Sequence, residues 1–130
     1  MNMLNQIIIE GIVEQEGLYN EENMIYANNI SCIRYNQTEN GEHSEEKVTA
    51  PFACYGKLAE CVSKYAFVGR KLRIVGRMKN FKLEETSRLG ILVEHVEFCP
   101  LTKDTVINPV NSETAEYLFA ASLKELNYVK

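Results

Sequence analysis

The stretch from Val48 to Lys79 limits the possible folds more than any other part of the chain. Its first residues alternate between apolar and polar as a strand does, and Gly56 marks a change to helical spacing over about Lys57 to Ala66. Gly69 ends this helix, and from Leu72 the chain alternates again, with one apolar and one mostly basic face. One short helix between two strands of a β-rich chain predicts a small closed β-barrel.

Three further strands are predicted around this segment, at Asn5 to Glu14, Met24 to Tyr35 and Arg88 to Phe98. We interpret the polar stretches Asn36 to Glu46 and Asn80 to Ser87 as long loops between strands. The predicted fold class is therefore all-β: a five-stranded OB-fold barrel with one internal helix between its third and fourth strands.

Local signals add detail to this barrel. The pair Asn40-Gly41 is typical of a hairpin turn, and Glu84-Glu85 is expected at the tip of the second loop. The apolar alternation changes parity between Val93 and Val96, which predicts a β-bulge. The first predicted strand carries isoleucines on both faces, so we expect part of its outer face to be covered by another subunit.

The last thirty residues have a different character. We predict an OB-fold domain over residues 1–99, and a linker and C-terminal helix over 100–130. The helix, from Ser112 to Asn127, is amphipathic, and the apolar face contains Ala115, Leu118, Phe119, Ser122, Leu123 and Leu126. This face could dock on the chain's own barrel or on a neighbouring subunit, and the sequence leaves both open.

The composition is that of one ordinary globular domain of 130 residues. No apolar run approaches the roughly 18 residues that span a bilayer, and the N-terminal residues lack the pattern of a secretory signal. We therefore expect a cytoplasmic protein that makes no membrane contact. Four cysteines without a C-x-x-C pair are expected to be reduced, small hydrophobic residues: Cys32, Cys54, Cys61 and Cys99.

Charge is distributed unevenly along the chain. The net charge is −4, but residues 1–56 carry −7, with two basic and nine acidic side chains. Residues 57–88 carry +6, with nine basic and three acidic side chains, and the remaining residues carry −3. A basic region of this kind can attract phosphates on an acidic protein, although it can also be only a solvated surface.

No pattern of catalytic or metal-binding residues is present in the sequence. His43 lies in the acidic loop and His95 in a strand, without the partners of a triad or a metal site. The adjacent pairs Glu45-Glu46 and Glu84-Glu85 are expected to be solvated. We expect no enzymatic activity, no cofactor and no bound metal.

The segment Tyr55-Gly56-Lys57-Leu58-Ala59-Glu60, followed by Leu72-Arg73-Ile74-Val75-Gly76-Arg77-Met78-Lys79, resembles the central part of bacterial single-stranded-DNA-binding proteins. The stretches Asn5 to Gly11 and Glu94 to Phe98 are similar to that family's opening and closing strands, so the resemblance covers roughly residues 4 to 98. It implies an OB-fold protein that coats exposed single-stranded DNA in replication, repair and recombination. It also implies a homodimer or a homotetramer.

Binding a single strand requires cations for the backbone and flat side chains on which bases stack. The candidate cations are Arg34, Lys47, Lys57, Arg73, Arg77, Lys79, Lys82 and Arg88. The candidate aromatic residues are Tyr35, Tyr55 and Phe81. We expect Phe81 to stack on a base, whereas Tyr55 could stack or belong to the core.

The chain differs from the family it resembles in two respects. It has no tryptophan, and Thr38, Thr49 and Leu83 stand where the family has its tryptophans. The family's acidic tip has no counterpart in Glu125 to Lys130, so recruitment of partners by that route is not implied. Two alternatives therefore stay open: an OB-fold interaction or scaffold subunit with weak or no nucleic-acid binding, and an RNA-binding OB module.

Overall fold

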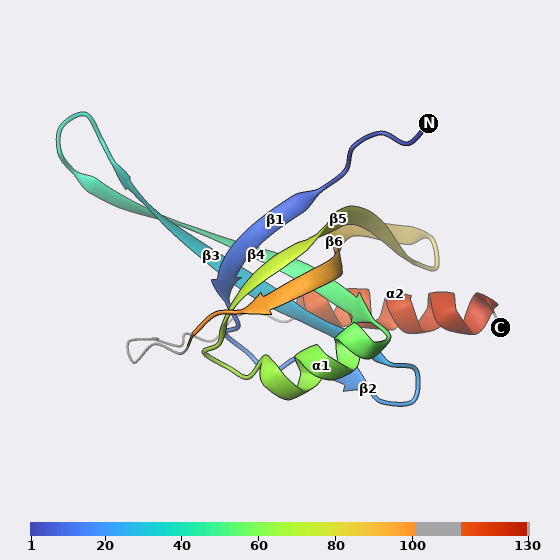
Figure 1. Cartoon of the computed structure of the whole chain (residues 1–130). Coiled ribbons are helices and arrows are strands. Elements are labelled where there is room, and N and C mark those ends of the chain that lie inside the picture. Colours follow the sequence, from blue (N-terminus) through green and yellow to red (C-terminus); the bar gives the residue numbers. More distant parts are fainter. Residues whose placement is uncertain (101–112, 130) are drawn as a thin grey trace.

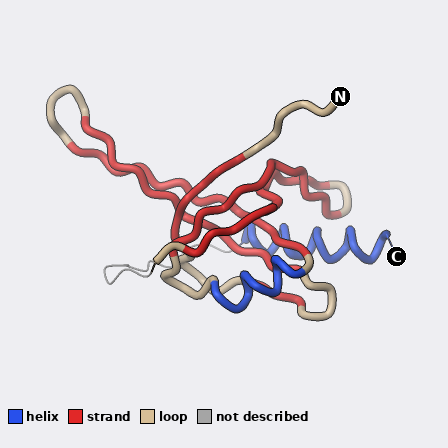
Figure 2. Tube along the Cα trace, in the orientation of Figure 1, coloured by secondary structure: helices blue, strands red, loops and turns tan. Residues whose placement is uncertain are grey.

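The computed structural model describes residues 1–100 and 113–129, and in the last helix it describes the side chains of residues 115–125. Strands make up most of the described chain, and two helices lie against them (Figures 1 and 2). The elements in chain order are β1 (Ile7–Ile12), β2 (Leu18–Asn20), β3 (Ile25–Gln37), β4 (His43–Tyr55), α1 (Lys57–Tyr65), β5 (Lys71–Leu83), β6 (Thr86–Phe98) and α2 (Glu113–Val129).

The strands form one sheet in the order β1-β5-β6-β4-β3-β2. A further pairing of β1 with β3, in which Ile12 lies opposite Ser31, closes five of the six strands into a barrel. The pairing of β4 with β6 is parallel, and the others are antiparallel. This closed order, with α1 between the third and fourth barrel strands, is the predicted OB fold. The short β2, which the sequence did not predict, pairs with β3 at the edge.

The barrel interior is filled by apolar side chains from all five barrel strands and from α1. Phe52 on β4 and Leu72 and Ile74 on β5 are fully buried there. Ala59 and Val62 of α1 are also buried, so this helix closes one end of the barrel. Gly56 begins the helix with a φ of 69°, a conformation that glycine adopts without strain, and the predicted change from strand to helix at this position is confirmed.

The predicted β-bulge is confirmed in the pairing of β5 with β6. Val75 lies opposite His95 and Gly76 opposite Val93, so Glu94 is an extra residue on β6. Because of this extra residue, Val93 and Val96 both face the barrel core despite their odd spacing. Gly76 is needed here because a Cβ at this position would lie only 2.2 Å from the carbonyl oxygen of Leu92.

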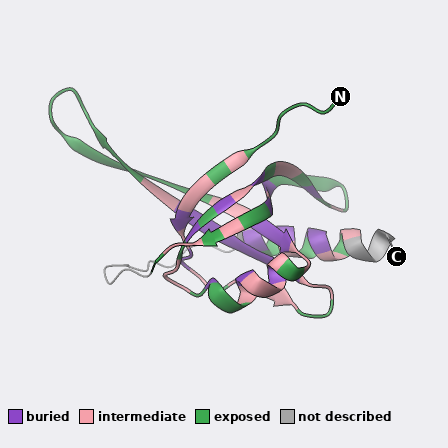
Figure 3. Ribbon diagram, in the orientation of Figure 1, coloured by how far each residue is buried: buried purple, intermediate pink, exposed green. Residues whose placement is uncertain are grey.

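The two predicted long loops are wrong in length, because the strands continue through them. The pairing of β3 with β4 extends to Gln37 opposite His43, so the turn occupies only residues 38–42. The turn at Asn40-Gly41 is confirmed, with Gly41 at a φ of 79°. The outer half of this hairpin projects from the barrel as an exposed arm (Figures 1 and 3). Both faces of the arm meet water and are polar, so the sequence of the arm resembles that of a loop.

The predicted loop from Asn80 to Ser87 is likewise mostly strand. Cross-strand pairing of β5 with β6 continues to Leu83 opposite Thr86, and only Glu84-Glu85 remains as the turn. Glu84 has a φ of 58°, as a residue in a tight turn can have. The expected position of this pair at the tip is confirmed.

Helix α2 packs on the outside of its own barrel, against β3, β4 and β5. A second apolar cluster fills this junction, with Ala27, Ala53 and Phe81 from the strands and Leu118 and Ala121 from the helix. The structure therefore shows the first of the two docking arrangements that the sequence left open. Most of the predicted linker and the side chain of Leu126 lie outside the described residues, and the predicted domain boundary stays a prediction.

All four cysteines are free, and burial raises the pKa of the Cys54 thiol above its usual range. Among the helices that the structure describes, none is long and apolar enough to cross a membrane.

Candidate nucleic-acid interface

The alternation of β4, β5 and β6 places several predicted site residues on one surface. Leu72 and Ile74 face the barrel core, so the odd-numbered residues of β5 point outward. We define the outer face by five predicted residues: Tyr55 on β4, Arg77, Lys79 and Phe81 on β5, and Arg88 on β6. Phe81 lies opposite Arg88, so their side chains are neighbours on this face.

Helix α2 lies directly on the outer face and holds it by polar contacts. The Lys79 ammonium is 2.6 Å from the carboxylate of Glu125. The hydroxyl groups of Tyr55 and Ser122 are 3.0 Å apart and share a hydrogen bond. These contacts come from the same side of the helix, because residues 122 and 125 are three positions apart.

A further pair of contacts joins α2 to the β5–β6 hairpin. The Arg88 guanidinium lies 5.3 Å from the centre of the Tyr117 ring, within the range of a cation–π interaction. The Tyr117 hydroxyl is 2.6 Å from the hydroxyl of Thr86. Four of the five residues of the outer face therefore contact α2 or are covered by it. Among the described contacts, none joins the fifth residue, Arg77, to α2.

The structure corrects the prediction for Phe81. We expected an exposed stacking residue, but its exposed fraction is 0% because Leu118 and Ala121 of α2 cover it. The Lys79 ammonium also lies 4.9 Å from the centre of the Phe81 ring. In this arrangement Phe81 is part of the junction between barrel and helix, and no base can reach its ring.

The sequence left open whether Tyr55 stacks on a base or belongs to the core, and the structure gives it an intermediate position. It is half-buried at the edge of α2 and belongs to the second apolar cluster, not to the barrel core. Burial raises the pKa of its hydroxyl above the usual value, and the hydrogen bond with Ser122 opposes that shift. Tyr55 is therefore partly accessible to solvent.

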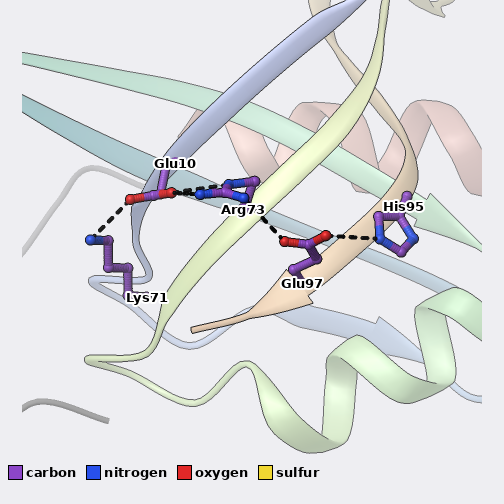
Figure 4. Close-up of polar contacts among 5 residues, drawn as sticks. All are labelled: Glu10, Lys71, Arg73, His95 and Glu97. Atoms are coloured by element: carbon purple, nitrogen blue, oxygen red, sulfur yellow. Dashed lines mark hydrogen bonds and ion pairs between the residues drawn. The ribbon is translucent and has the colours of Figure 1, made fainter. Parts of the chain in front are cut away.

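Arg73 lies further along β5 in a network of charges that runs across three strands (Figure 4). Glu10 on β1 binds both the Arg73 guanidinium at 2.8 Å and the Lys71 ammonium at 2.9 Å. Arg73 also contacts Glu97 at 3.3 Å, and His95 lies 3.7 Å from Glu97. Lys71 and Arg73 together lower the pKa of the Glu10 carboxyl. A phosphate at Arg73 would have to compete with two carboxylates.

The arm of β3 and β4 carries three predicted residues. Tyr35 is 75% exposed, and Arg34 points to the opposite face of the arm because neighbouring strand residues alternate. Lys47 binds the buried carboxylate of Glu14 at 2.8 Å. Tyr35 is therefore the most accessible of the three predicted aromatic residues.

Four of the predicted cations are exposed and, in the part of the chain that the structure describes, make no hydrogen bond, ion pair or cation–π contact. They are Arg34, Lys57, Arg77 and Lys82. The structure does not gather them in one place, because Lys82 points away from the outer face and Lys57 begins α1.

Sequence reasoning missed the carboxylates that contact the predicted cations. Glu10 and Glu97 lie directly opposite Arg73 on the two neighbouring strands. Both contacts could have been inferred from the strand register, had the register been known. Glu125 could not have been found in this way, because it reaches Lys79 from a helix whose docking position the sequence leaves open. Among the described residues, no group of histidine, cysteine, aspartate or glutamate side chains is arranged to hold a metal ion.

Comparison of the sequence with family models and with curated proteins finds no match. Solved structures, however, share the fold. The chain is similar to the Plasmodium falciparum SSB in a complex with ssDNA, with 14% identity, a TM-score of 0.63, and coverage of 77% of this chain and 98% of that one. It is also similar to a small single-stranded DNA-binding protein from Streptomyces coelicolor, with 14% identity, a TM-score of 0.60, and coverage of 75% and 96%.

A third similar structure is the single-stranded DNA-binding protein from Thermus aquaticus, with 16% identity and a TM-score of 0.58. The match covers 75% of this chain and 50% of that one. These comparisons show that the chain has the OB fold of these proteins. At this level of identity they establish the fold alone.

Proposed function

We propose that the protein binds single-stranded DNA and coats exposed strands during replication, repair and recombination. The observation that carries this proposal is the agreement of the whole barrel with a solved OB-fold protein in a complex with ssDNA, of which 98% is covered. The exposed cations and the two tyrosines that solvent can reach, Tyr35 and Tyr55, supply the chemistry that such binding requires.

The mechanism follows from the charges. Arg77 is exposed and free of described ion pairs, it shares the outer face with Tyr55, and its charge acts to lower the pKa of the Tyr55 hydroxyl. A phosphate can bind Arg77 while a base stacks on the accessible part of the tyrosine ring. Because cations displace condensed counterions from the strand, affinity should fall steeply as salt rises.

The test is a fluorescence-anisotropy titration with a labelled oligothymidine at several salt concentrations. Arg77→Gln should weaken binding to every sequence and reduce the salt dependence by about one unit of slope. Lys64→Gln is the matched control, because it removes the same charge from α1, where Lys64 pairs with Glu60. If Arg77→Gln binds the oligonucleotide as tightly as wild type, the outer face is not the DNA-binding surface.

A second candidate function is an interaction or scaffold subunit with weak or no nucleic-acid binding. The observation that favours it is the burial of Phe81 under α2, together with the ion pairs that occupy Arg73 and Lys79. An oligothymidine that does not bind even at low salt would support this alternative. An RNA oligonucleotide in the same titration tests the RNA-binding module, which requires tighter binding to RNA than to DNA of the same sequence.

The proposal includes self-association as a homodimer or homotetramer. Ile8 of β1 has an exposed fraction of 66% and points away from the barrel core, which supports the pairing of two copies through this strand. We also propose a cytoplasmic protein without enzymatic activity or cofactor. The solved structures that it resembles are named as DNA-binding proteins, and the four free cysteines suit a reducing compartment.

A further inference from the structure

We propose that α2 is an intramolecular competitor of the single strand, so that the outer face is occupied either by α2 or by DNA. This inference rests on the proposed function and specifies the surface and its regulation. The bound strand would contact Tyr55, Lys79 and Phe81 after α2 has moved away.

The carboxylate of Glu125 occupies the position that a phosphate would take. It lies 2.6 Å from the Lys79 ammonium, which is only partly exposed, with 23% of the side chain accessible. A contact of this length is a charge-assisted hydrogen bond, the same kind of contact that a lysine makes with a phosphate oxygen. Glu125 and a phosphate therefore cannot bind this face of Lys79 together.

The aromatic surface is covered by the same helix. Leu118 lies over Gly90, where a Cβ would be 2.5 Å from the leucine Cδ2 atom and 3.1 Å from the Phe81 ring. The absence of a side chain at Gly90 leaves a flat area beside Phe81, and Leu118 fills it. Bases stack on flat aromatic surfaces of this kind, so the leucine occupies the space of a stacked base.

The barrel core does not depend on α2. Among the described residues, the cluster that fills the barrel interior contains strand and α1 residues but none from α2. The junction with α2 is a separate cluster on the outside of the sheet. The helix can therefore leave the outer face while the barrel remains packed.

The junction is also suited to release. Its fully buried members are mostly small, Ala27, Ala53 and Ala121, with Phe81 and Leu118 as the two large ones. Five partly buried apolar side chains pack around them: Tyr55, Leu83, Leu92, Tyr117 and Phe119. The remaining contacts include polar pairs, which water and salt ions can replace. Displacement of α2 would expose an aromatic ring, a tyrosine and a lysine together.

The first experiment changes one charge of the competitor in the full chain. Glu125→Gln should tighten oligothymidine binding by about twofold to fivefold, the range expected from loss of a partly exposed ion pair. Glu94→Gln is the matched control, because Glu94 is exposed on β6, away from α2, and the net charge changes equally. An effect of Glu125→Gln no larger than that of the control would overturn the proposal.

The second experiment measures α2 directly by amide hydrogen exchange, with and without oligothymidine. We expect residues 117–125 to lose protection when DNA binds, while β1 and β5 keep theirs. Leu118→Asp should lower the protection of α2 without DNA and should bind DNA more tightly than wild type. If DNA binds and α2 keeps its protection, the competition is refuted and the proposed function stands. If neither wild type nor either variant binds DNA, the proposed function is refuted, and the competition with it.

Discussion

The burial of Phe81 predicts that the loss of its ring lowers the stability of the fold, which can be measured without DNA. Phe81→Ala removes a ring that is fully buried between the sheet and α2. Truncation of a buried phenylalanine lowers the free energy of unfolding by about 3–5 kcal/mol, because the lost contacts leave a cavity. For a chain of 130 residues, an unfolding entropy of about 2.1 cal/mol/K per residue converts this loss to a fall in Tm of about 11–18 °C.

The assay is thermal unfolding followed by circular dichroism, supported by urea titration. Tyr35→Ala is the control, because Tyr35 is 75% exposed and its loss should change stability by less than about 0.5 kcal/mol. The Leu118→Ala variant completes a double-mutant cycle, in which residues in contact should show a coupling of about 0.5–3 kcal/mol. If Phe81→Ala melts within about 2 °C of wild type, Phe81 is not buried by α2 and the described junction is wrong.

Three further predictions concern other parts of the chain. The ion pairs of Glu10 lower its pKa in the folded protein, so they stabilise the fold at pH values above its unfolded pKa of about 4.3. Glu10→Gln should therefore be less stable than wild type in urea at pH 7. The difference should begin to shrink as the pH falls below about 4.3, and it should be lost only when the pH falls through the lowered pKa of the folded state. An unchanged difference at acid pH would exclude this role. Ile8→Glu should shift the chain to monomer in light scattering without a large change in Tm, and a wild-type monomer at micromolar concentration would defeat the self-association. Gly76→Ala should lower the free energy of unfolding by at least about 1–3 kcal/mol because its Cβ would meet the Leu92 carbonyl, and an unchanged urea midpoint would contradict that contact.

The barrel and its helix were predictable because they follow from local periodicity. A strand with one buried face alternates, and a helix with one buried face repeats at 3.6, so the segment from Val48 to Lys79 contains its own signals. The bulge was predictable for the same reason, because the change of parity between Val93 and Val96 is visible in the sequence. The lengths of the two hairpins were not. The outer part of the β3–β4 hairpin has water on both faces and lacks an apolar period. In the β5–β6 hairpin one face is covered by α2, and the two apolar residues there, Phe81 and Leu83, are too few to show a period.

The candidate site was only partly predictable, for a physical reason. The sequence indicated which residues could bind phosphates and bases, and the alternation of β5 brings Arg77, Lys79 and Phe81 to one face. Exposure and pairing, however, depend on contacts between residues far apart in the chain. Lys79 contacts Glu125 at a separation of 46 residues, and no local pattern contains that information.

The bulge at Glu94 has a consequence for how the chain tolerates changes in length. Because Glu94 is the extra residue, its deletion would leave a regular ladder in which Val75 still lies opposite His95 and Gly76 opposite Val93. Val96 and Phe98 would still face the core, and Glu97 would still face Arg73. A deletion in the middle of β5, which has no extra residue, would instead turn the residues on one side of it to the opposite face of the sheet. The bulge is therefore the position at which this strand pair can lose one residue without turning its apolar side chains toward the solvent.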